Sequence, residues 1–106
     1  IKETHHKEKL DSPSGTAISL ANDIIRKSDS FKSWTKNKNS KGISMISKRQ
    51  NKKIGIHNIS FESKFDKIKI QHEAFTRDAF AKGSIMAAKW IKNKKGIFKM
   101  DDILGF

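Results

Sequence analysis

The sequence predicts an α+β domain, a two-layer sandwich in which one mixed β-sheet carries helices on one face. Two segments, at residues 13–27 and 78–92, repeat their apolar side chains with helical spacing. Between them, residues 54–63 and 66–74 place apolar side chains at alternate positions, which is typical of strands with one face in water. Helices and strands of this kind pack as layers around one core.

The first helix is expected to begin at Ser12-Pro13 and to continue to about Lys27. Proline suits the first turn, where its missing N–H has no helical partner, and a serine directly before it is a good N-cap. Apolar residues then follow at helical spacing, namely Ala17, Ile18, Ala21, Ile24 and Ile25. The second helix contains Gly83, which indicates close packing against another backbone because glycine costs about 1 kcal/mol relative to alanine.

The remaining elements are shorter. Residues 28–42 are polar and lysine-rich, and they predict a loop or a short helical turn held by Phe31 and Trp34. The other expected elements are a strand, a basic turn and a short docking helix, at residues 43–47, 48–53 and 96–104.

Composition limits the class of protein. The 106 residues suffice for one domain, and the lack of cysteine excludes a disulfide framework and a thiolate metal site. No apolar run reaches the roughly 18 residues of a membrane span, and the first residues contain no apolar part of a signal peptide. Since the chain does not begin with methionine, we expect it to start within a longer protein.

The net charge of +12 favours one alternative, a small basic nucleic-acid-binding module that would use Phe31 and Trp34 for stacking. However, 20 of the 23 basic residues are lysine, whereas arginine is the better residue for bidentate contacts to phosphates and base edges. We therefore expect a solvated lysine surface with only non-specific attraction to nucleic acid. Another alternative is a decayed chain that keeps its fold without a function.

The segment from His5 to Ala17 is the strongest candidate for a binding or catalytic site. It combines two histidines, Lys9 and a helix start. Free N–H groups at a helix start attract anions, and imidazole and ammonium groups bind carboxylates and transfer protons. The segment thus suits a small, multiply negative substrate that is protonated during a reaction. The alternatives are solvated histidines and a simple helix cap, and a metal site is disfavoured because adjacent histidines rarely chelate one ion.

This segment also carries a family resemblance. His5-His6, Lys9 and the run Asp11-Ser12-Pro13-Ser14-Gly15-Thr16-Ala17 resemble the motif of the dihydrodipicolinate (4-hydroxy-tetrahydrodipicolinate) reductase family. Later segments resemble the C-terminal half of that family in the same order: Arg49, Gly55-Ile56-His57, His72 with Arg77, Phe80-Ala81-Lys82-Gly83, Ala87-Ala88-Lys89-Trp90 and residues 96–104. The resemblance implies that residues 1–106 form the substrate-binding and oligomerisation domain of a bacterial, cytoplasmic enzyme of the diaminopimelate and lysine pathway.

The resemblance also implies roles for single residues. His5 and Lys9 are the expected catalytic pair for proton transfer. Contacts to the carboxylates of the cyclic substrate are expected from His6, Gly15 and Thr16, and secondarily from Ser14 and Arg77. Hydride addition to a conjugated imine leaves electron density that needs a proton, and a cationic pocket stabilises it.

The family uses NADH or NADPH, held by an N-terminal domain with a Gly-rich fingerprint. The glycines of this chain, at positions 15, 42, 55, 83, 96 and 105, never lie two apart, so G-x-G-x-x-G cannot occur. We therefore expect the cofactor domain to lie outside the chain, which alone is catalytically incomplete. The resemblance implies a homotetramer formed through a sheet, although Asn51-Lys52 and Ile56 replace acidic residues that many members carry there.

Overall fold

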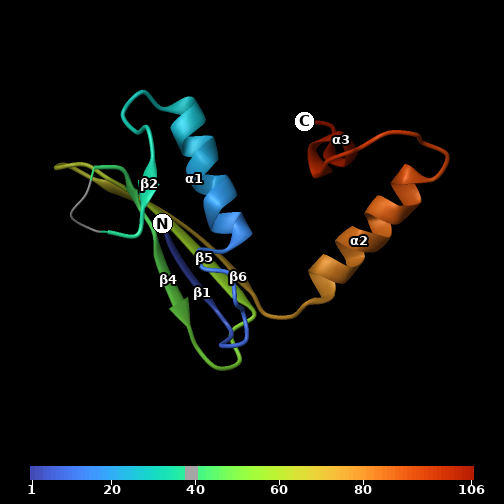
Figure 1. Ribbon diagram of the computed structural model, residues 1–106, viewed down its shortest axis with the longest axis horizontal. Coiled ribbons are helices and arrows are strands. Elements are labelled where there is room, and N and C mark those ends of the chain that lie inside the picture. Colours follow the sequence, from blue (N-terminus) through green and yellow to red (C-terminus); the bar gives the residue numbers. More distant parts are fainter. Residues whose placement is uncertain (38–40) are drawn as a thin grey trace. The chain divides into compact units, whose positions relative to one another are not determined.

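The structure is a computed structural model that describes residues 1–37 and 41–106. The chain divides into two compact units, Ile1–Phe75 and Thr76–Phe106. The first unit contains the β-strands and the first helix, and the second contains the other two helices (Figure 1). None of the described helices is long and apolar enough to cross a membrane.

A four-stranded mixed sheet with the order β4-β1-β5-β6 dominates the first unit. Strand β1 (Lys2–His5) is parallel to β4 (Ile46–Arg49) and antiparallel to β5 (Gly55–Glu62), which is antiparallel to β6 (Lys67–Ala74). The mixed sheet confirms the predicted α+β class. Strand β1 is not among the elements predicted from the sequence, because its buried side chains are polar.

Helix α1 (Gly15–Lys27) lies alongside the sheet (Figure 1). Its N-cap is Ser14, whose Oγ accepts a hydrogen bond from the N–H of Ala17 at 3.2 Å. The expected start at Ser12-Pro13 is therefore wrong by two residues, since the capping oxygen comes from the serine after the proline. The end of the helix at Lys27 confirms the prediction.

A small apolar core lies between α1 and the strands. Its buried residues are Ala17, Ala21, Ile43 and Met45, and Ile1, Ile18, Ile24, Ile25 and Trp34 pack around them. Trp34 belongs to β2 (Trp34–Thr35), which is parallel to β3 (Ile43–Ser44). The segment predicted as a loop or helical turn thus contains a strand, and Trp34 serves the core. The single strand predicted at 43–47 is two strands, β3 and β4, and β4 extends into the predicted basic turn.

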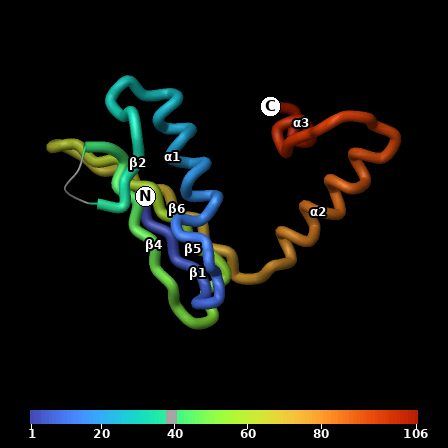
Figure 2. The backbone as a smooth tube through the Cα atoms, in the orientation of Figure 1, coloured from blue at the N-terminus to red at the C-terminus, as the bar shows by residue number. Residues whose placement is uncertain are grey.

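Strands β5 and β6 form a long hairpin and run side by side (Figure 2). Ile59 is opposite Ile70, and Phe61 is opposite Ile68. The side chains of this apolar face are largely exposed, with 44% of Phe61, 61% of Ile68 and 56% of Ile70 accessible. The alternation is confirmed, but the chain itself leaves much of the apolar face uncovered. An exposed apolar face of this kind is typical of an interaction surface.

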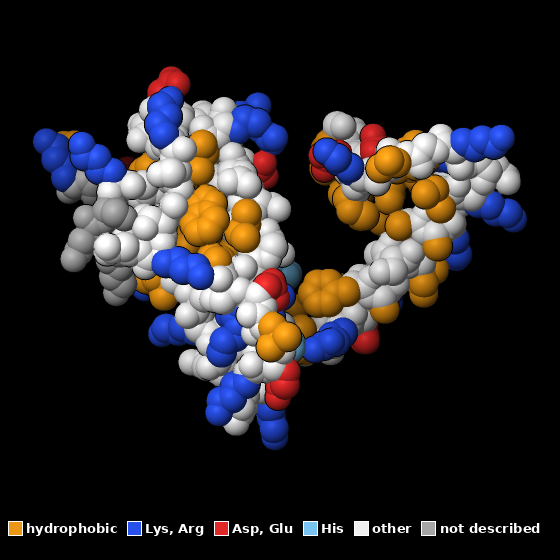
Figure 3. Space-filling view, in the orientation of Figure 1, with side chains coloured by type: hydrophobic (Ala, Val, Ile, Leu, Met, Phe, Trp, Pro, Cys, Tyr) orange, Lys and Arg blue, Asp and Glu red, His pale blue; other side chains and the backbone are white. Residues whose placement is uncertain are grey.

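The second unit consists of α2 (Asp78–Ile91) and α3 (Met100–Leu104). The rings of Trp90 and Phe98 pack edge to face, with centroids 5.2 Å apart. Every residue of both helices is at least partly exposed, and Figure 3 shows hydrophobic side chains along their surface. A Cβ atom at Gly83 would meet no described atom within 4 Å, so the close packing predicted at this glycine is not found within the described chain.

Candidate active site

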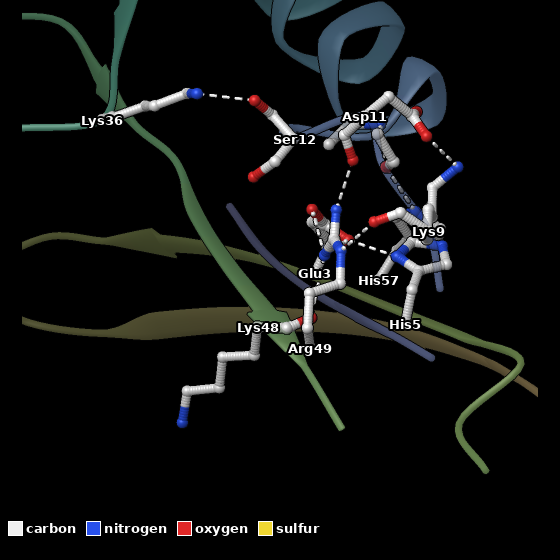
Figure 4. Close-up of polar contacts among 11 residues, drawn as sticks. Glu3, His5, Lys9, Asp11, Ser12, Lys36, Lys48, Arg49 and His57 are labelled. Atoms are coloured by element: carbon white, nitrogen blue, oxygen red, sulfur yellow. Dashed lines mark hydrogen bonds and ion pairs between the residues drawn. The ribbon is translucent and has the colours of Figure 1, made fainter. Parts of the chain in front are cut away.

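The polar site of the first unit lies where the end of β1, the segment before α1 and strand β5 meet. Figure 4 shows His5, Lys9 and His57 close together, with Glu3 and Arg49 beside them. Two of the predicted residues, His5 and Lys9, therefore lie in one polar cluster.

Glu3 and His5 are buried on the same face of β1, because side chains two residues apart on a strand point the same way. Only 1% of Glu3 and 8% of His5 is exposed. The His5 Nδ1 atom is hydrogen-bonded to the Glu3 Oε2 atom. Arg49 Nη1 donates to Oε1 and Oε2 of Glu3 at 3.0 and 3.1 Å. The buried carboxylate is therefore paired with a cation and has hydrogen-bond partners at both oxygens.

The surroundings of Glu3 hold it in the charged form. Burial by itself would raise the pKa of the Glu3 carboxyl, because a charge is poorly solvated there. Hydrogen bonds from Ser47, Arg49 and His5 outweigh the burial and lower the pKa of Glu3 below its usual value. Glu3 is thus an anion and a pure acceptor at neutral pH.

His57 connects the strand β5 to the start of α1. Its Nε2 atom lies 3.1 Å from Oγ of Ser14, and its ring meets the His5 ring edge to face with centroids 5.0 Å apart. Burial, and then the charge of His5, lower the pKa of His57. Nε2 of His57 and Oγ of Ser14 share a hydrogen bond, and the same Oγ accepts the N–H of Ala17.

Lys9 and Asp11 form an ion pair, with Nζ of Lys9 2.8 Å from Oδ1 of Asp11. The hydrogen bond from Lys9 is the main cause that lowers the pKa of Asp11, and the backbone N–H of Gly15 lowers it further. A carboxylate of the chain itself therefore contacts Lys9, which the sequence predicts for proton transfer.

The predicted residues still to be placed are His6, Gly15, Thr16 and Arg77. His6 is half-buried, and its Nδ1 atom lies 3.0 Å from the carboxylate of Glu8. Gly15 and Thr16 are exposed in the first turn of α1, and a Cβ atom at Gly15 would meet no described atom within 4 Å. This open surface suits a ligand that approaches the backbone. Arg77 precedes α2 in the second unit, so its contact with the substrate stays a prediction.

Four residues of the site were missing from the predicted set, namely Glu3, Asp11, Arg49 and His57, and His57 entered the sequence analysis only as part of the family resemblance. For Glu3 the signal was its spacing of two from His5, but that spacing has meaning only once β1 is recognised as a strand. Arg49 and Asp11 belong to the family resemblance, yet neither their spacing nor their type indicates the contacts that they make.

Glu3, His5 and His57 also offer ligand atoms within 4.8 Å of one another, close enough to hold a metal ion. The contacts favour a hydrogen-bonded network instead. Both Glu3 oxygens accept from the Arg49 guanidinium, and such a fixed positive charge opposes a second cation at the same carboxylate.

Comparison with known proteins places the chain in a family. The family model described as the C-terminus of dihydrodipicolinate reductase matches residues 1–104. The chain belongs to the dihydrodipicolinate reductase family. A 4-hydroxy-tetrahydrodipicolinate reductase from Christiangramia forsetii is 44% identical over 105 residues, which are 98% of this chain and 44% of that protein. One from Buchnera aphidicola subsp. Schizaphis graminum is 43% identical over 119 residues, covering 98% of this chain and 42% of the relative.

Solved structures agree with the family. The dipicolinate-bound dihydrodipicolinate reductase from Paenisporosarcina sp. TG-14 matches with a TM-score of 0.70 and 26% identity, over 96% of this chain and 43% of that one. The α+β fold predicted from the sequence is therefore the fold of this part of the family. The chain spans less than half the length of the relatives that it matches.

Proposed function

We propose that this chain is the substrate-binding C-terminal part of a cytoplasmic 4-hydroxy-tetrahydrodipicolinate reductase of the diaminopimelate and lysine pathway. The observation that carries the proposal is the meeting of His5, Lys9 and the start of α1 in one site (Figure 4). A related structure that holds dipicolinate, a planar cyclic dicarboxylate, supports it.

In this proposal, the start of α1 binds one carboxylate of the substrate. Gly15 and Thr16 are exposed in the first turn, where backbone N–H groups lack helical acceptors and the helix dipole favours an anion. His6 adds a side-chain donor. Ser14 contributes mainly by capping the helix, because its hydroxyl is buried between Ala17 and His57.

His5 and Lys9 supply the proton. Reduction of a cyclic conjugated imine leaves an electron pair that must be protonated, and the proton donor must lie within hydrogen-bond reach of it. The Lys9 ammonium and the hydrogen-bonding imidazole of His5 in one site also stabilise the negative charge that develops on the substrate. This division assigns proton transfer to β1 and to the segment before α1.

The hydride would come from NADH or NADPH when that cofactor is bound. The residues of this chain do not fit a dinucleotide site of the usual kind, because its six glycines never fall two apart and, within residues 1–37 and 41–106, no Gly-rich turn joins a strand to a helix. We therefore assign the cofactor to an N-terminal dinucleotide-binding domain outside this chain.

The exposed face of the β5–β6 hairpin, formed by Ile59, Phe61, Ile68 and Ile70, suits self-association into a homotetramer. Apolar faces of this kind are covered in stable assemblies, and antiparallel hairpins of identical copies can pair face to face. The lysines are spread over much of the view in Figure 3, which fits a solvated surface with only non-specific attraction to nucleic acid.

The proposal is tested by titrating isotope-labelled chain with pyridine-2,6-dicarboxylate and following its amide signals by NMR. We expect shifts at Gly15, Thr16 and His6, with an affinity in about the millimolar range, since only part of a pocket is present. Pyridine-2-carboxylate, with a single carboxylate, should bind more weakly.

Two substitutions at one position provide a matched pair. Thr16→Pro removes one N–H in the first turn, where a helix tolerates proline, and should weaken binding of both ligands. Thr16→Ala keeps the N–H and should bind the dicarboxylate like the unchanged chain. Shifts spread evenly over residues 36–53, with none at the start of α1, would show that the helix start is only a cap.

A further inference from the structure

We propose that Glu3 and Arg49 are positioning residues that hold the His5 imidazole with its proton on Nδ1 and leave Nε2 to exchange a proton with the substrate. The inference rests on the proposed function, in which His5 takes part in proton transfer.

The contact between Glu3 and His5 decides which ring nitrogen carries the proton. The Nδ1 atom of His5 faces Oε2 of Glu3, and the charged carboxylate can only accept a hydrogen bond. Nδ1 must therefore be the donor, and a hydrogen bond to an ionised acceptor is about twice as strong as one between neutral groups. Nε2 is then a lone pair in the neutral ring and the exchangeable donor in the protonated ring.

Arg49 holds the carboxylate in place. Its Nη1 atom donates to both oxygens of Glu3, at 3.0 and 3.1 Å. Its Nε atom donates to the carbonyl oxygen of Lys9 at 3.2 Å, and Nη2 donates to that of Asp11 (Figure 4). The Arg49 guanidinium therefore connects Glu3, which orients His5, with the segment that carries Lys9. A lysine could not make these contacts together, because it lacks the planar set of donors.

The absence of a side chain at Gly55 leaves space for the His5 ring. A Cβ atom at this buried position would lie 3.2 Å from Nε2 and 3.3 Å from Cδ2 of His5. Any side chain at Gly55 would press on the nitrogen that the proposal leaves free. Among the described residues, no hydrogen bond to Nε2 of His5 is found, so no partner within them competes for this nitrogen.

A buried carboxylate that fixes the tautomer of a histidine is an established catalytic arrangement, as in the Ser-His-Asp triad. There the carboxylate does not itself take up the proton, but keeps the imidazole in the orientation and tautomer that the reaction needs. Glu3 has the features for this role: it is charged, 1% exposed and hydrogen-bonded to the ring.

The tautomer can be measured directly from the ring ¹⁵N shifts of His5 in the 106-residue chain. At a pH where titration shows the ring to be neutral, we expect a protonated-type shift at Nδ1 and an unprotonated-type shift at Nε2. The preference should be at least about tenfold, as a hydrogen bond to a charged group provides. A proton found mainly on Nε2 overturns the proposal without any substitution.

Glu3→Gln removes the charge with little change in shape. Because an amide both donates and accepts, both tautomers of His5 should become populated, and the two ring shifts should move toward each other. The matched control is Glu73→Gln on β6, which removes the 3.0 Å ion pair to Lys53 in the same sheet and should leave the His5 shifts unchanged. Unchanged His5 shifts in a folded Glu3→Gln chain would refute the proposal.

Arg49→Lys tests the second residue, with the charge retained. We expect the His5 ring shifts and the amide signals of residues 9–11 to move together, because one side chain holds both. Movement of the amide signals alone would limit Arg49 to a structural role in that segment.

If Glu3→Gln does not fold, the tautomer measured in the unchanged chain and the result for Arg49→Lys still test the proposed positioning roles. A lack of dicarboxylate shifts would contradict the proposed function, and the tautomer measurement is independent of that outcome.

Discussion

The Nε2 atom of His57 lies 3.1 Å from Oγ of Ser14, so strand β5 is joined to the residue that caps α1. The same oxygen accepts the N–H of Ala17 at 3.2 Å, and only 2% of Ser14 is exposed. One hydroxyl therefore fixes both where the helix begins and how its first turn is placed against the sheet.

We expect Ser14→Ala to lower the free energy of unfolding by about 1–2 kcal/mol, because loss of an N-cap costs about 1 kcal/mol and a half-buried imidazole nitrogen loses its partner. Urea unfolding followed by circular dichroism measures the change. Ser12→Ala is the matched control: this serine is exposed and does not cap α1, so its effect should stay within about 0.5 kcal/mol. Equal losses in the two variants would contradict the assigned cap.

The stability of the first unit should fall as the pH is lowered from about 6.5, the usual pKa of histidine. Burial, and then the charge of His5, lower the pKa of His57 in the folded chain. Between that lowered pKa and about 6.5 the unfolded chain binds more protons than the folded chain, so acidification favours unfolding. The loss is complete below the folded-state pKa, and the full stability is present above about pH 6.5.

His57→Gln should make the pH dependence shallower between about pH 6.5 and 5, because an amide cannot titrate but can still hydrogen-bond Ser14. Urea unfolding at closely spaced pH values measures the slope. Glu3 contributes in a lower range: its pKa is lowered on folding, so its contribution is lost only below about pH 4.3. An equally steep slope above that range in the His57→Gln chain would exclude His57 as the cause.

The elements that sequence alone predicts well are those with local signals. Helix α1 ends at Lys27 and α2 begins at Asp78, as their apolar spacing indicates. Strand β1 has no such signal, because its buried residues are Glu3 and His5 and their burial depends on Arg49, far along the chain. The proposed catalytic pair, His5 and Lys9, is predicted from the family motif, whereas the network around it depends on the pairing of β1 with β4 and β5.

The hairpin shows a second limit of sequence reasoning. Its alternation predicts that Ile59 and Phe61 share one face, as do Ile68 and Ile70. The register that pairs Ile59 with Ile70 and Phe61 with Ile68 is found only in the structure. Alternation does not reveal what covers that face, and in this chain it is largely exposed.

Ile70→Glu should abolish self-association of the chain, because it puts a charge into the centre of the exposed apolar face. Sedimentation equilibrium measures the oligomeric state. Gln71→Glu adds the same charge at the next position of β6, where the side chain points to the other face of the sheet, and should leave association unchanged. A monomeric unchanged chain, or equal effects of both substitutions, would argue against this face as the contact between copies.

The position of Asp11 predicts that its carboxylate competes with a carboxylate of the substrate. Its carboxylate contacts Nζ of Lys9 at 2.8 Å, and the backbone N–H of Gly15 contributes to lowering its pKa, so it acts on two groups that the proposed function gives to proton transfer and substrate binding. A substrate carboxylate at the start of α1 must displace this side chain or lie beside a like charge. Because 56% of the Asp11 side chain is exposed, it can move away without loss of packing.

Asp11→Asn should therefore raise the affinity for pyridine-2,6-dicarboxylate severalfold, and the gain should shrink at high salt, which screens exposed charges. Calorimetric titration at two salt concentrations measures both effects. Asp23→Asn removes the same charge from α1, at an exposed ion pair with Arg26, and controls for the general rise in positive charge. An equal gain in both variants would assign the effect to net charge alone. A weaker affinity in Asp11→Asn would show instead that Asp11 assists binding, by holding the ammonium of Lys9 where the substrate needs it.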